Sequence, residues 1–241
     1  MSKKILIYGG SSLISKELIN IFVKEDYRFL VFCRKAETFF NNISSLNIEK
    51  NKFDVFEADL LDLQKNFELI SKLEKNLEGV IWVAGFTGDP LKEFDNAELT
   101  ENNIKVNFLH PILIINKLLS KINMNGTGFL AVISSVAGLR GREKNIFYGS
   151  AKSALISFLS GLRQKFNGRL NILTIIPGYM STKPFKENAP QFLITTPEKT
   201  AKIIVRAIKL KKEIVYINSL WRIIMFGIRL IPEKIFKKLK F

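Results

Sequence analysis

The sequence predicts an α/β fold in which seven parallel strands form one doubly wound sheet, covered by helices on both faces. Short apolar runs of strand length alternate along the chain with longer segments whose apolar residues recur every three or four positions. No linker, repeat or low-complexity segment interrupts this alternation, so residues 1–218 are expected to form a single domain. At 241 residues, 47% of them hydrophobic, the chain can bury a sizeable core.

Each predicted strand is a short apolar run followed by a glycine, a proline or a polar residue. The fourth run, GVIWVA, is apolar throughout, which is typical of a parallel strand buried on both faces. The seven predicted strands occupy residues 4–8, 28–33, 53–58, 79–84, 127–134, 170–176 and 213–217.

Segments with helical periodicity lie between the strands. In residues 12–25 the positions at helical spacing are Leu13, Ile14, Leu18, Ile21 and Phe22. The other predicted helices occupy residues 63–77, 96–122, 147–166 and 197–211, and residues 34–51 are polar and partly helical. Pro111 lacks a backbone N–H, so it is expected to kink the 96–122 segment or divide it in two.

The first strand, the Gly9-Gly10 turn and the helix after it are arranged as in the opening unit of a Rossmann-type dinucleotide-binding fold. In such sheets ligands bind at the carboxyl ends of the strands. Residues that directly follow predicted strands should therefore converge on one edge, and they are Gly9, Arg34, Asp59, Ala84, Ser135 and Pro177.

The segment ISSVAGLRGREKNIFYGSAK, residues 133–152, carries the clearest chemistry. Tyr148 and Lys152 are four residues apart, so in a helix they lie on one face. An ammonium beside a phenol favours the phenolate, and the pKa of Tyr148 is therefore expected to fall. Ser135 could donate a hydrogen bond to the same substrate oxygen. This set suits proton transfer at a carbonyl or hydroxyl while a cofactor moves a hydride, although a bare Tyr and Lys pair also occurs on ordinary helix surfaces.

Composition argues against several other classes. With one cysteine, Cys33, and one histidine, His110, the chain is not expected to form an internal disulfide, a metal site or a Ser-His-Asp triad. The N-terminus MSKKILIYGG lacks a signal-peptide pattern, so a cytoplasmic location is expected. The net charge is +15, yet no nucleic-acid-binding motif accompanies it, and no nucleic-acid partner is expected.

The whole chain resembles the short-chain dehydrogenase/reductase family. Ser135, Tyr148-x-x-x-Lys152 and Asn107 in KVNF match the positions of the family's catalytic tetrad. The resemblance implies that Tyr148 is the general acid in reduction, and that Lys152 lowers its pKa and holds the nicotinamide ribose. It implies further that Ser135 orients the substrate oxygen and that Asn107 holds a water linking Lys152 to solvent. Alone, Asn107 fits equally a buried helix residue bonded to backbone. Homodimers or homotetramers are common in the family.

The phosphate-binding loop departs from the family pattern T-G-x-x-x-G-x-G. Gly9 is kept, but Leu13 and Ser15 stand where the second and third glycines belong. The second glycine allows close backbone approach to the pyrophosphate, so Leu13 is the larger departure, whereas Ser15 is small. Donors to phosphate remain in the serines and in the helix N-terminus. The loop positions expected to contact the cofactor are Gly9, Ser11, Ser12, Leu13 and Ile14.

The cofactor type is indicated by Cys33-Arg34-Lys35 at the end of the second strand, where NAD enzymes usually carry an acid. Two cations suit a 2′-phosphate, so NADP(H) is favoured, with NAD(H) as the alternative. The remaining cofactor positions follow from the resemblance. Asp59 and Leu60 are expected at the adenine. Ala84 and Gly85 belong to the family's Asn-Asn-Ala-Gly element, in which Trp82 and Val83 replace the two asparagines here. Pro177, Gly178, Met180 and Thr182 belong to a P-G-x-x-x-T motif at the nicotinamide.

Residues 219–241 form a basic tail, since residues 209–241 hold nine Lys or Arg against two Glu. Residues 220–231 are mostly apolar but too short and too charged, with Arg222 and Arg229, to span a bilayer. Pro232 separates them from EKIFKKLKF, so two short amphipathic helices are predicted. These helices could lie on an anionic membrane surface, such as the inner face of the cell membrane. Alternatively, they could fold over the substrate site, or pack against the domain or a dimer partner.

The tail pattern W-R-x-x-M…I-R-x-I-P-x-x-I-F-K-K-L and residues 83–89 and 134–155 resemble the decaprenylphosphoryl-2-keto-erythro-pentose reductases. That resemblance implies a keto-sugar carried on a polyprenyl phosphate as substrate.

The favoured interpretation is an NADP(H)-dependent oxidoreductase that interconverts a keto group and a secondary alcohol on a small-molecule or lipid-linked substrate. Two other interpretations stay open. One is a non-catalytic dinucleotide-binding or regulatory protein, motivated by Leu13 and Ser15. The other is a peripheral membrane module whose tail is the functional part.

Overall fold

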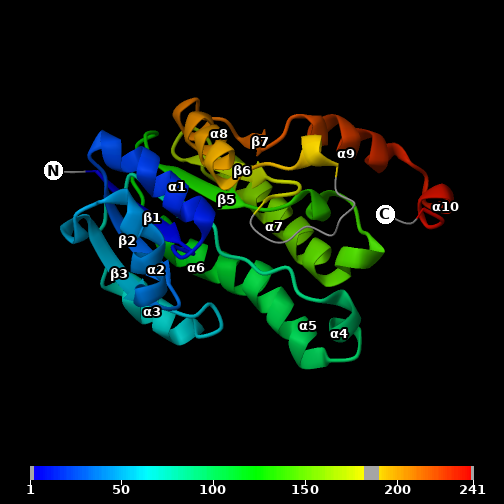
Figure 1. The fold of residues 1–241 in the computed structure, drawn as a ribbon, viewed down its shortest axis with the longest axis horizontal. Coiled ribbons are helices and arrows are strands. Elements are labelled where there is room, and N and C mark those ends of the chain that lie inside the picture. Colours follow the sequence, from blue (N-terminus) through cyan, green and yellow to red (C-terminus); the bar gives the residue numbers. More distant parts are fainter. Residues whose placement is uncertain (1–2, 182–189, 240–241) are drawn as a thin grey trace.

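A computed structural model of the chain describes residues 3–181 and 190–239. Seven parallel strands form one sheet in the order β3-β2-β1-β4-β5-β6-β7 (Figure 1). The chain winds outward from β1 to β3, returns to β4, and winds outward in the other direction. The predicted doubly wound sheet is therefore confirmed, and its switch point lies between β1 and β4. The strands are β1 (Lys4–Tyr8), β2 (Arg28–Cys33), β3 (Phe53–Glu57), β4 (Gly79–Trp82), β5 (Phe129–Ile133), β6 (Asn171–Ile176) and β7 (Ile214–Tyr216).

Helices cover both faces of the sheet (Figure 1). One face carries α1 (Leu13–Phe22), α2 (Ala36–Ile43) and α8 (Pro197–Lys209), and the other carries α3 (Leu63–Ser71), α6 (His110–Leu119) and α7 (Ile146–Lys165). Successive strand residues point to opposite faces, so Ile5 and Ile7 join the first core while Leu6 and Tyr8 join the second. A sheet buried on both faces explains why the strands are apolar runs rather than alternating ones.

The segment 96–122 is divided near Pro111, as predicted, but by a π-helical turn and not by a break. The helix α5 (Ala97–Ile104) leads into a π turn at Lys105–Leu109, and α6 follows directly. The His110 N–H donates to the carbonyl five residues back, and Pro111 lies in the first turn of α6, where its missing N–H is tolerated. Such turns interrupt helices at functional sites, and this one contains Asn107.

Two local predictions are wrong. The helix predicted over residues 63–77 ends at Ser71, because the chain turns there to bring Leu77 into a parallel bridge with Ile122. A short helix, α4 (Pro90–Phe94), lies in the loop that follows β4, where none was predicted. The Asp89 carboxylate caps it by accepting a bond from the Leu91 N–H at 3.2 Å.

The tail forms α9 (Leu220–Leu230) and α10 (Glu233–Phe236), at the opposite end of the molecule from the N-terminus (Figure 1). Trp221 and Met225 of α9 pack with Val136, Ile176 and Leu193 in a third apolar cluster. One face of α9 is therefore part of the domain. No helix in the described ranges 3–181 and 190–239 is long and apolar enough to cross a membrane.

Arg140 fixes α10 against the domain. Its guanidinium lies 4.3 Å from the centroid of the Phe236 ring and donates to the Glu233 carboxylate at 2.7 Å and to the Ile231 carbonyl at 3.2 Å. The second helix of the tail is thus held by a stacked cation and an ion pair.

Candidate functional site

A cavity of about 610 Å³ opens at the carboxyl ends of β1, β2, β3 and β4. It spans the switch point of the sheet, where doubly wound folds bind their ligands. The convergence of post-strand residues predicted from the sequence is confirmed for the first four strands. The predicted residues that line the cavity are Gly9, Ser11, Ser12, Arg34, Asp59, Leu60, Ala84 and Gly85.

Gly9 allows the loop after β1 to lie against the end of β4. Its φ is +94°, in the region that side chains other than glycine rarely adopt. A Cβ at this position would lie 2.6 Å from the Ala84 nitrogen. The N–H groups of Gly9 and Gly10 both donate to the Phe32 carbonyl, at 2.9 and 3.0 Å. Only a glycine at position 9 permits this approach of loop and strand.

Ser15 stabilises the loop from the position where the family carries its third glycine. Its buried hydroxyl donates to the Gly9 carbonyl at 2.9 Å, and its N–H donates to the Ser12 hydroxyl at 3.0 Å. Ser12 is thereby the N-cap of α1, and this N-cap lines the cavity. A helix N-terminus of this kind favours phosphate groups.

Leu13 and Ile14 do not line the cavity. The Leu13 side chain is 45% exposed, so it leaves the cavity open. Ile14 is buried in the core between α1 and the sheet, and any contact it made with a cofactor would come from its backbone. The Leu13 side chain therefore takes up no space in the cavity, and whether the loop backbone approaches a pyrophosphate as closely as with glycine stays a prediction.

Ser11 lines the same end of the cavity, and its hydroxyl is buried. The hydroxyl lies beside the Cys33 thiol. Burial raises the pKa of this thiol, and a hydrogen bond with Ser11 acts against that rise. A ligand that brings acceptor oxygens to this end of the cavity would offer the hydroxyl a stronger acceptor than a thiol.

Arg34 and Lys35 follow β2 as two exposed cations, and neither forms an ion pair with any residue in the described ranges. The nearby carboxylate of Glu57 is engaged, since it accepts a bond from the Ala36 N–H at 2.7 Å. Arg34 and Lys35 thus bring two cations to the end of β2, and Arg34 lines the cavity there.

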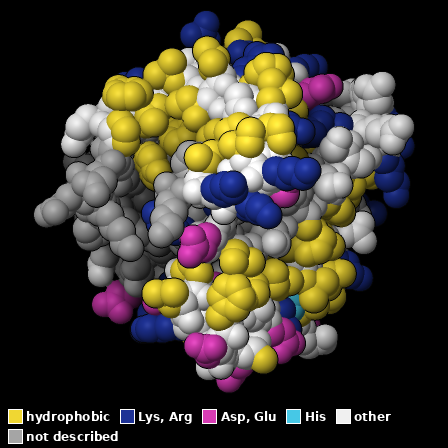
Figure 2. Space-filling view, turned by 90° about the vertical axis from the view of Figure 1, so that its right-hand side faces the viewer, with side chains coloured by type: hydrophobic (Ala, Val, Ile, Leu, Met, Phe, Trp, Pro, Cys, Tyr) yellow, Lys and Arg dark blue, Asp and Glu magenta, His cyan; other side chains and the backbone are white. Residues whose placement is uncertain are grey.

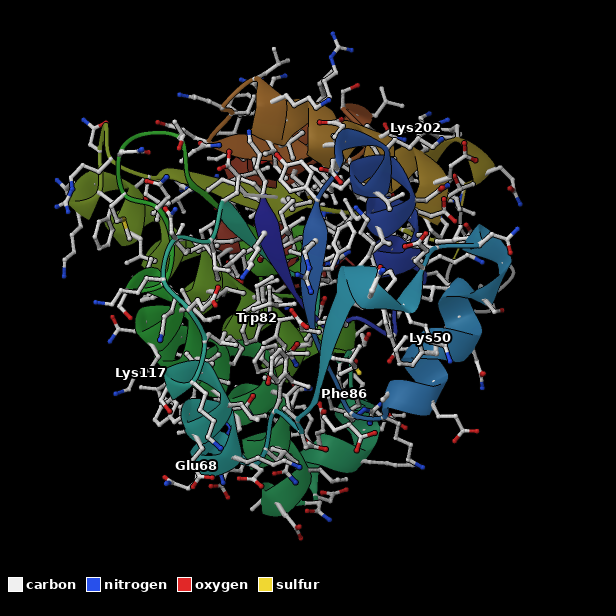
Figure 3. The ribbon with its side chains drawn as sticks, turned by 90° about the vertical axis from the view of Figure 1, so that its left-hand side faces the viewer. Lys50, Glu68, Trp82, Phe86, Lys117 and Lys202 are labelled. Carbon is white, nitrogen blue, oxygen red and sulfur yellow. The ribbon has the colours of Figure 1, made fainter. Side chains whose placement is uncertain are left out.

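Trp82 takes a structural role in place of the first Asn of the family element. It is fully buried, and its ring stacks on Tyr8 with centroids 4.2 Å apart. Its indole N–H donates to the Ala84 carbonyl at 3.1 Å, which fixes the turn leading to Gly85. Figure 3 places Trp82 deep in the interior, whereas the labelled lysines lie at the periphery.

Tyr148 and Lys152 lie one turn apart on α7, as their spacing predicts. The Lys152 side chain is 3% exposed, and its Nζ lies 5.7 Å from the centroid of the Tyr148 ring and 3.4 Å from the Ile133 carbonyl. A Cβ on Gly85 would lie 3.1 Å from this Nζ. The ammonium therefore lies directly behind Gly85, at the end of the cavity.

The expected fall in the pKa of Tyr148 is wrong for this structure. Burial raises the pKa of its phenol, and a hydrogen bond with Ser135 acts in the opposite direction. Burial also lowers the pKa of Lys152, to about 8. Lys152 lies over the ring and is itself desolvated, so the loss of water around the phenol outweighs the attraction between the pair. At neutral pH the phenol keeps its proton.

Ser135 begins the turn Val136–Leu139 after β5 and accepts a bond from the Ala137 N–H at 3.1 Å. Two residues that the sequence argument left without a role hold this turn on α7. The Ser134 hydroxyl donates to the Lys152 carbonyl at 3.1 Å, and a Cβ on Gly138 would lie 2.7 Å from the Lys152 carbonyl carbon. The small size of Ser134 and Gly138 was the signal in the sequence that the turn packs closely against a neighbouring segment.

Asn107 is fully buried and clamps the loop after β4. Its amide donates to the Phe86 carbonyl at 2.7 Å, and its Oδ1 accepts from the Phe86 N–H at 3.1 Å. A further bond joins it to the Asn103 side chain at 2.8 Å. These are the bonds of the buried, backbone-bonded asparagine that the sequence left open, and they fix the backbone next to Gly85.

The loop after β6 lies beside the tail. The Pro177 carbonyl accepts a bond from the Val136 N–H at 3.0 Å, and a Cβ on Gly178 would lie 1.9 Å from the Trp221 Nε1. Met180 forms a bridge with Thr195. Thr182 lies outside the described residues.

Sequence reasoning missed the wall of the cavity opposite the phosphate loop. Leu99, Asn102 and Val106 line it, together with the half-exposed Phe86 that Figure 3 labels. Their spacing of three and four residues within the predicted helix was the signal, since it places them on one face.

Comparison with known proteins decides the family. The short chain dehydrogenase family matches residues 3–191. The chain belongs to this family. As a short-chain dehydrogenase it is an oxidoreductase by family. It is 28% identical over 245 residues to the uncharacterized oxidoreductase Rv2073c of Mycobacterium tuberculosis, covering 98% of this chain and 96% of the relative.

Two further matches extend over most of this short-chain dehydrogenase. It is 23% identical over 188 residues to a 3-oxoacyl-acyl-carrier-protein reductase of Bos taurus, covering 78% of this chain and 79% of the relative. A short chain dehydrogenase of Burkholderia cenocepacia in complex with NADP has the same fold, with a TM-score of 0.81 at 14% identity, over 100% of this chain and 98% of the other.

Proposed function

We propose that this short-chain dehydrogenase is an NADP(H)-dependent ketoreductase, which interconverts a keto group and a secondary alcohol. The observation that carries the proposal is the position of the Lys152 Nζ. It lies beside the Tyr148 ring and next to Gly85, and Gly85 lines the cavity formed by the first four strands, so only this glycine separates the acid–base pair on α7 from that cavity. A proton donor and a nucleotide-sized cavity thus share one edge of the sheet.

The residues of this chain would bind NADPH through the first turn of α1 and through Arg34, and NADPH when bound would supply a hydride. Tyr148 keeps its proton at neutral pH and donates it to the substrate oxygen as charge develops there. Ser135, whose side chain acts on the pKa of the Tyr148 phenol, orients that oxygen. Lys152 provides a nearby positive charge that stabilises the phenolate left behind. Asn107 keeps the backbone next to Gly85 in place, and a proton relay through water from Lys152 remains a prediction.

The preference for NADP(H) over NAD(H) is supported by the two cations after β2, which have no ion-pair partner among the described residues. A guanidinium is well suited to a 2′-phosphate. The Burkholderia enzyme with the same fold was solved in complex with NADP.

The substrate class we infer is a keto-sugar. Its lipid-linked form would be a keto-sugar carried on a polyprenyl phosphate. The resemblance to decaprenylphosphoryl-2-keto-erythro-pentose reductases points to it, and the exposed apolar side chains of α9 and α10 support it. A substrate of this kind is anchored in a bilayer, and peripheral membrane contact through the tail would bring the enzyme to it. Homodimers or homotetramers remain a family-based prediction, testable by light scattering.

Replacing Tyr148 by Phe tests the reaction. Removal of the phenolic proton donor should lower turnover by roughly 10²–10⁴-fold. Binding of NADPH, followed by the fluorescence of the nicotinamide, should change little, because the ring and Lys152 remain. Turnover is measured with NADPH against a panel of keto-sugars and lipid-linked keto-sugars.

The matched control is Tyr27→Phe, which makes the same chemical change at a tyrosine next to β2, far along the chain from α7. It should keep wild-type turnover. A Tyr148→Phe protein that turns over like the wild type would remove the proposed acid. Absence of binding of both nicotinamide cofactors would instead favour a function without a dinucleotide.

A further inference from the structure

We propose that the outer face of the tail helices docks on the surface of an anionic lipid bilayer. We call this surface the lipid face, and its apolar members are Ile223, Phe226 and Leu230 of α9 and Ile235 of α10. The proposal specifies the partner and the contact residues of the tail, and it holds whether or not the keto-sugar substrate is correct.

The lipid face is apolar without being part of the core. Ile223, Phe226 and Leu230 are 70%, 68% and 68% exposed, and their spacing of three and four residues places them on one side of α9. Trp221 and Met225 point to the opposite side, into the domain. The helix is therefore apolar on two opposite faces, and only one of them is covered. Large exposed apolar groups gathered in this way mark an interaction surface.

Basic side chains surround the lipid face. Arg222 and Arg229 lie two turns apart on the same flank of α9, about 10 Å apart along its axis. Together with Tyr216 they line a groove of about 290 Å³ beside the apolar residues. The tail helices continue this charge with Lys234, Lys237 and Lys238. None of these five cations forms an ion pair with a residue that the structure describes.

Two acidic side chains lie near these cations among the described residues. Glu143 lines a cavity together with Lys237, but no ion pair joins the two. Glu233 is engaged by Arg140 at 2.7 Å, so it compensates a charge of the domain. Figure 2 looks onto this side of the molecule and shows hydrophobic side chains gathered there with Lys and Arg side chains beside them. An apolar face bordered by unpaired cations is the pattern of a helix that lies in the interface of an anionic membrane.

Charge decides between a bilayer and a second copy of the chain. In a two-fold symmetric dimer the same surface meets itself, so the cations of one copy would face those of the other. Like charges at an interface without acidic partners oppose association. Anionic headgroups have the complementary charge, and their acyl region accepts Phe226 and its neighbours. The Arg140 contacts hold α10 in place, so the lipid face is formed before docking.

Docking in this orientation also places the bilayer next to the site. Trp221 projects from the inner side of α9 onto Gly178, in the loop after β6. The lipid face and the nicotinamide loop expected from the sequence are therefore separated by the thickness of a single helix.

Co-sedimentation of the full chain with vesicles tests the proposal. One set of vesicles is phosphatidylcholine alone, and in the other a third of the lipid is phosphatidylglycerol. The wild-type chain should bind the anionic vesicles and leave the neutral ones, and added salt should weaken binding. The Ile223→Ser/Phe226→Ser and Arg222→Glu/Arg229→Glu proteins should each bind the anionic vesicles roughly tenfold or more weakly.

Two matched variants control for hydrophobicity and charge. Leu91→Ser removes an apolar side chain that is 83% exposed on α4, and Lys72→Glu/Lys75→Glu makes the same charge change on exposed residues after α3. Both should bind vesicles like the wild type. Circular dichroism melts confirm that every variant is folded.

Three results would overturn the proposal. The first is that the wild-type chain fails to bind anionic vesicles. The second is that the control variants lose as much binding as the lipid-face variants. The third is that light scattering shows a dimer that the Ile223→Ser/Phe226→Ser substitutions dissociate. Turnover of a water-soluble keto substrate in the absence of lipid should be unchanged in the lipid-face variants. The membrane proposal and the proposed reaction can therefore fail separately.

Discussion

Lys152 carries a positive charge where the fold gives it little compensation. Its Nζ has one weak contact, with the Ile133 carbonyl at 3.4 Å, and no carboxylate among the described residues lies in ion-pair range. Burial lowers its pKa from 10.5 to about 8, so the folded state is destabilised by the charged form. A residue that destabilises the fold and lies next to a cavity is typically retained because it serves the function of the protein.

The Lys152→Met protein should consequently be more stable than the wild type at neutral pH and inactive as a reductase. The pH dependence has a definite sign. Between about 8 and 10.5 the unfolded chain keeps a proton on this lysine that the folded chain has lost, so stability rises with pH through this group. That contribution should be missing in Lys152→Met. Urea unfolding across this range measures both effects.

The wild-type curve and that of Lys165→Met, an equivalent change near the exposed end of α7, serve as controls. A Lys152→Met protein that is less stable than the wild type at neutral pH would show that the ammonium stabilises the fold, contrary to this argument.

What the sequence could and could not predict at single residues follows from the same physics. Spacing alone places Tyr148 and Lys152 on one face of a helix, and that prediction is confirmed. The direction of the Tyr148 pKa shift depends on how much water surrounds the phenol, and spacing does not report burial. In the same way, Leu13 departs from the family motif, yet its side chain is exposed and does not line the cavity.

Among the elements, α9 is the one whose role the sequence left open, because its residues are apolar on two sides. Only the structure shows which side is buried. The π turn escaped prediction because it involves a contact between separate segments, in which Asn107 lies against Phe86. The signal for α4 was local and was missed: Asp89 is its N-cap and Pro90 lies in its first turn.

Trp221 tests whether α9 positions the loop after β6. Trp221→Ala would leave a hole above Gly178 and should lower stability by about 3–5 kcal/mol. Trp221→Phe keeps a ring there, and it loses no hydrogen bond because the indole N–H has no partner among the described residues. It should therefore stay close to the wild type. Thermal unfolding gives the stabilities, and the KM for NADPH reports the loop.

If α9 positions the loop, Trp221→Ala raises the KM for NADPH while Trp221→Phe does not. Phe226→Ala on the exposed side of the same helix is the matched control and should change neither quantity. Equal effects of Trp221→Ala and Phe226→Ala would mean that α9 does not support the site.

At the scale of the molecule, the order of the strands was predictable because it depends on simple rules. Apolar runs alternating with helices require parallel strands, and right-handed crossovers leave few arrangements of them. The edge where ligands bind follows from that arrangement, which is why residues distant in sequence, such as Gly9 and Gly85, could be assigned to one site. The predicted catalytic residues on α7 and after β5 are connected to this edge only through the packing of Lys152 behind Gly85.

Binding of a cofactor across this switch point should stabilise the whole domain, because the unfolded chain has no such cavity. NADPH at about a hundred times its Kd would add about 2.7 kcal/mol, which corresponds to a rise in Tm of roughly 5–10 °C for a domain of this size. NADH at the same concentration should give a smaller rise, since it lacks the 2′-phosphate that Arg34 and Lys35 are placed to meet.

In the Arg34→Ala/Lys35→Ala protein the rise with NADPH should fall to that seen with NADH, and the rise with NADH should stay as in the wild type. Lys72→Ala/Lys75→Ala, with the same loss of charge away from the cavity, should keep the full difference between the cofactors. Equal shifts for the two cofactors in the wild type would make the preference for NADP(H) wrong. A preference that survives in the double variant would place the 2′-phosphate elsewhere in the cavity, against other residues than the two cations after β2.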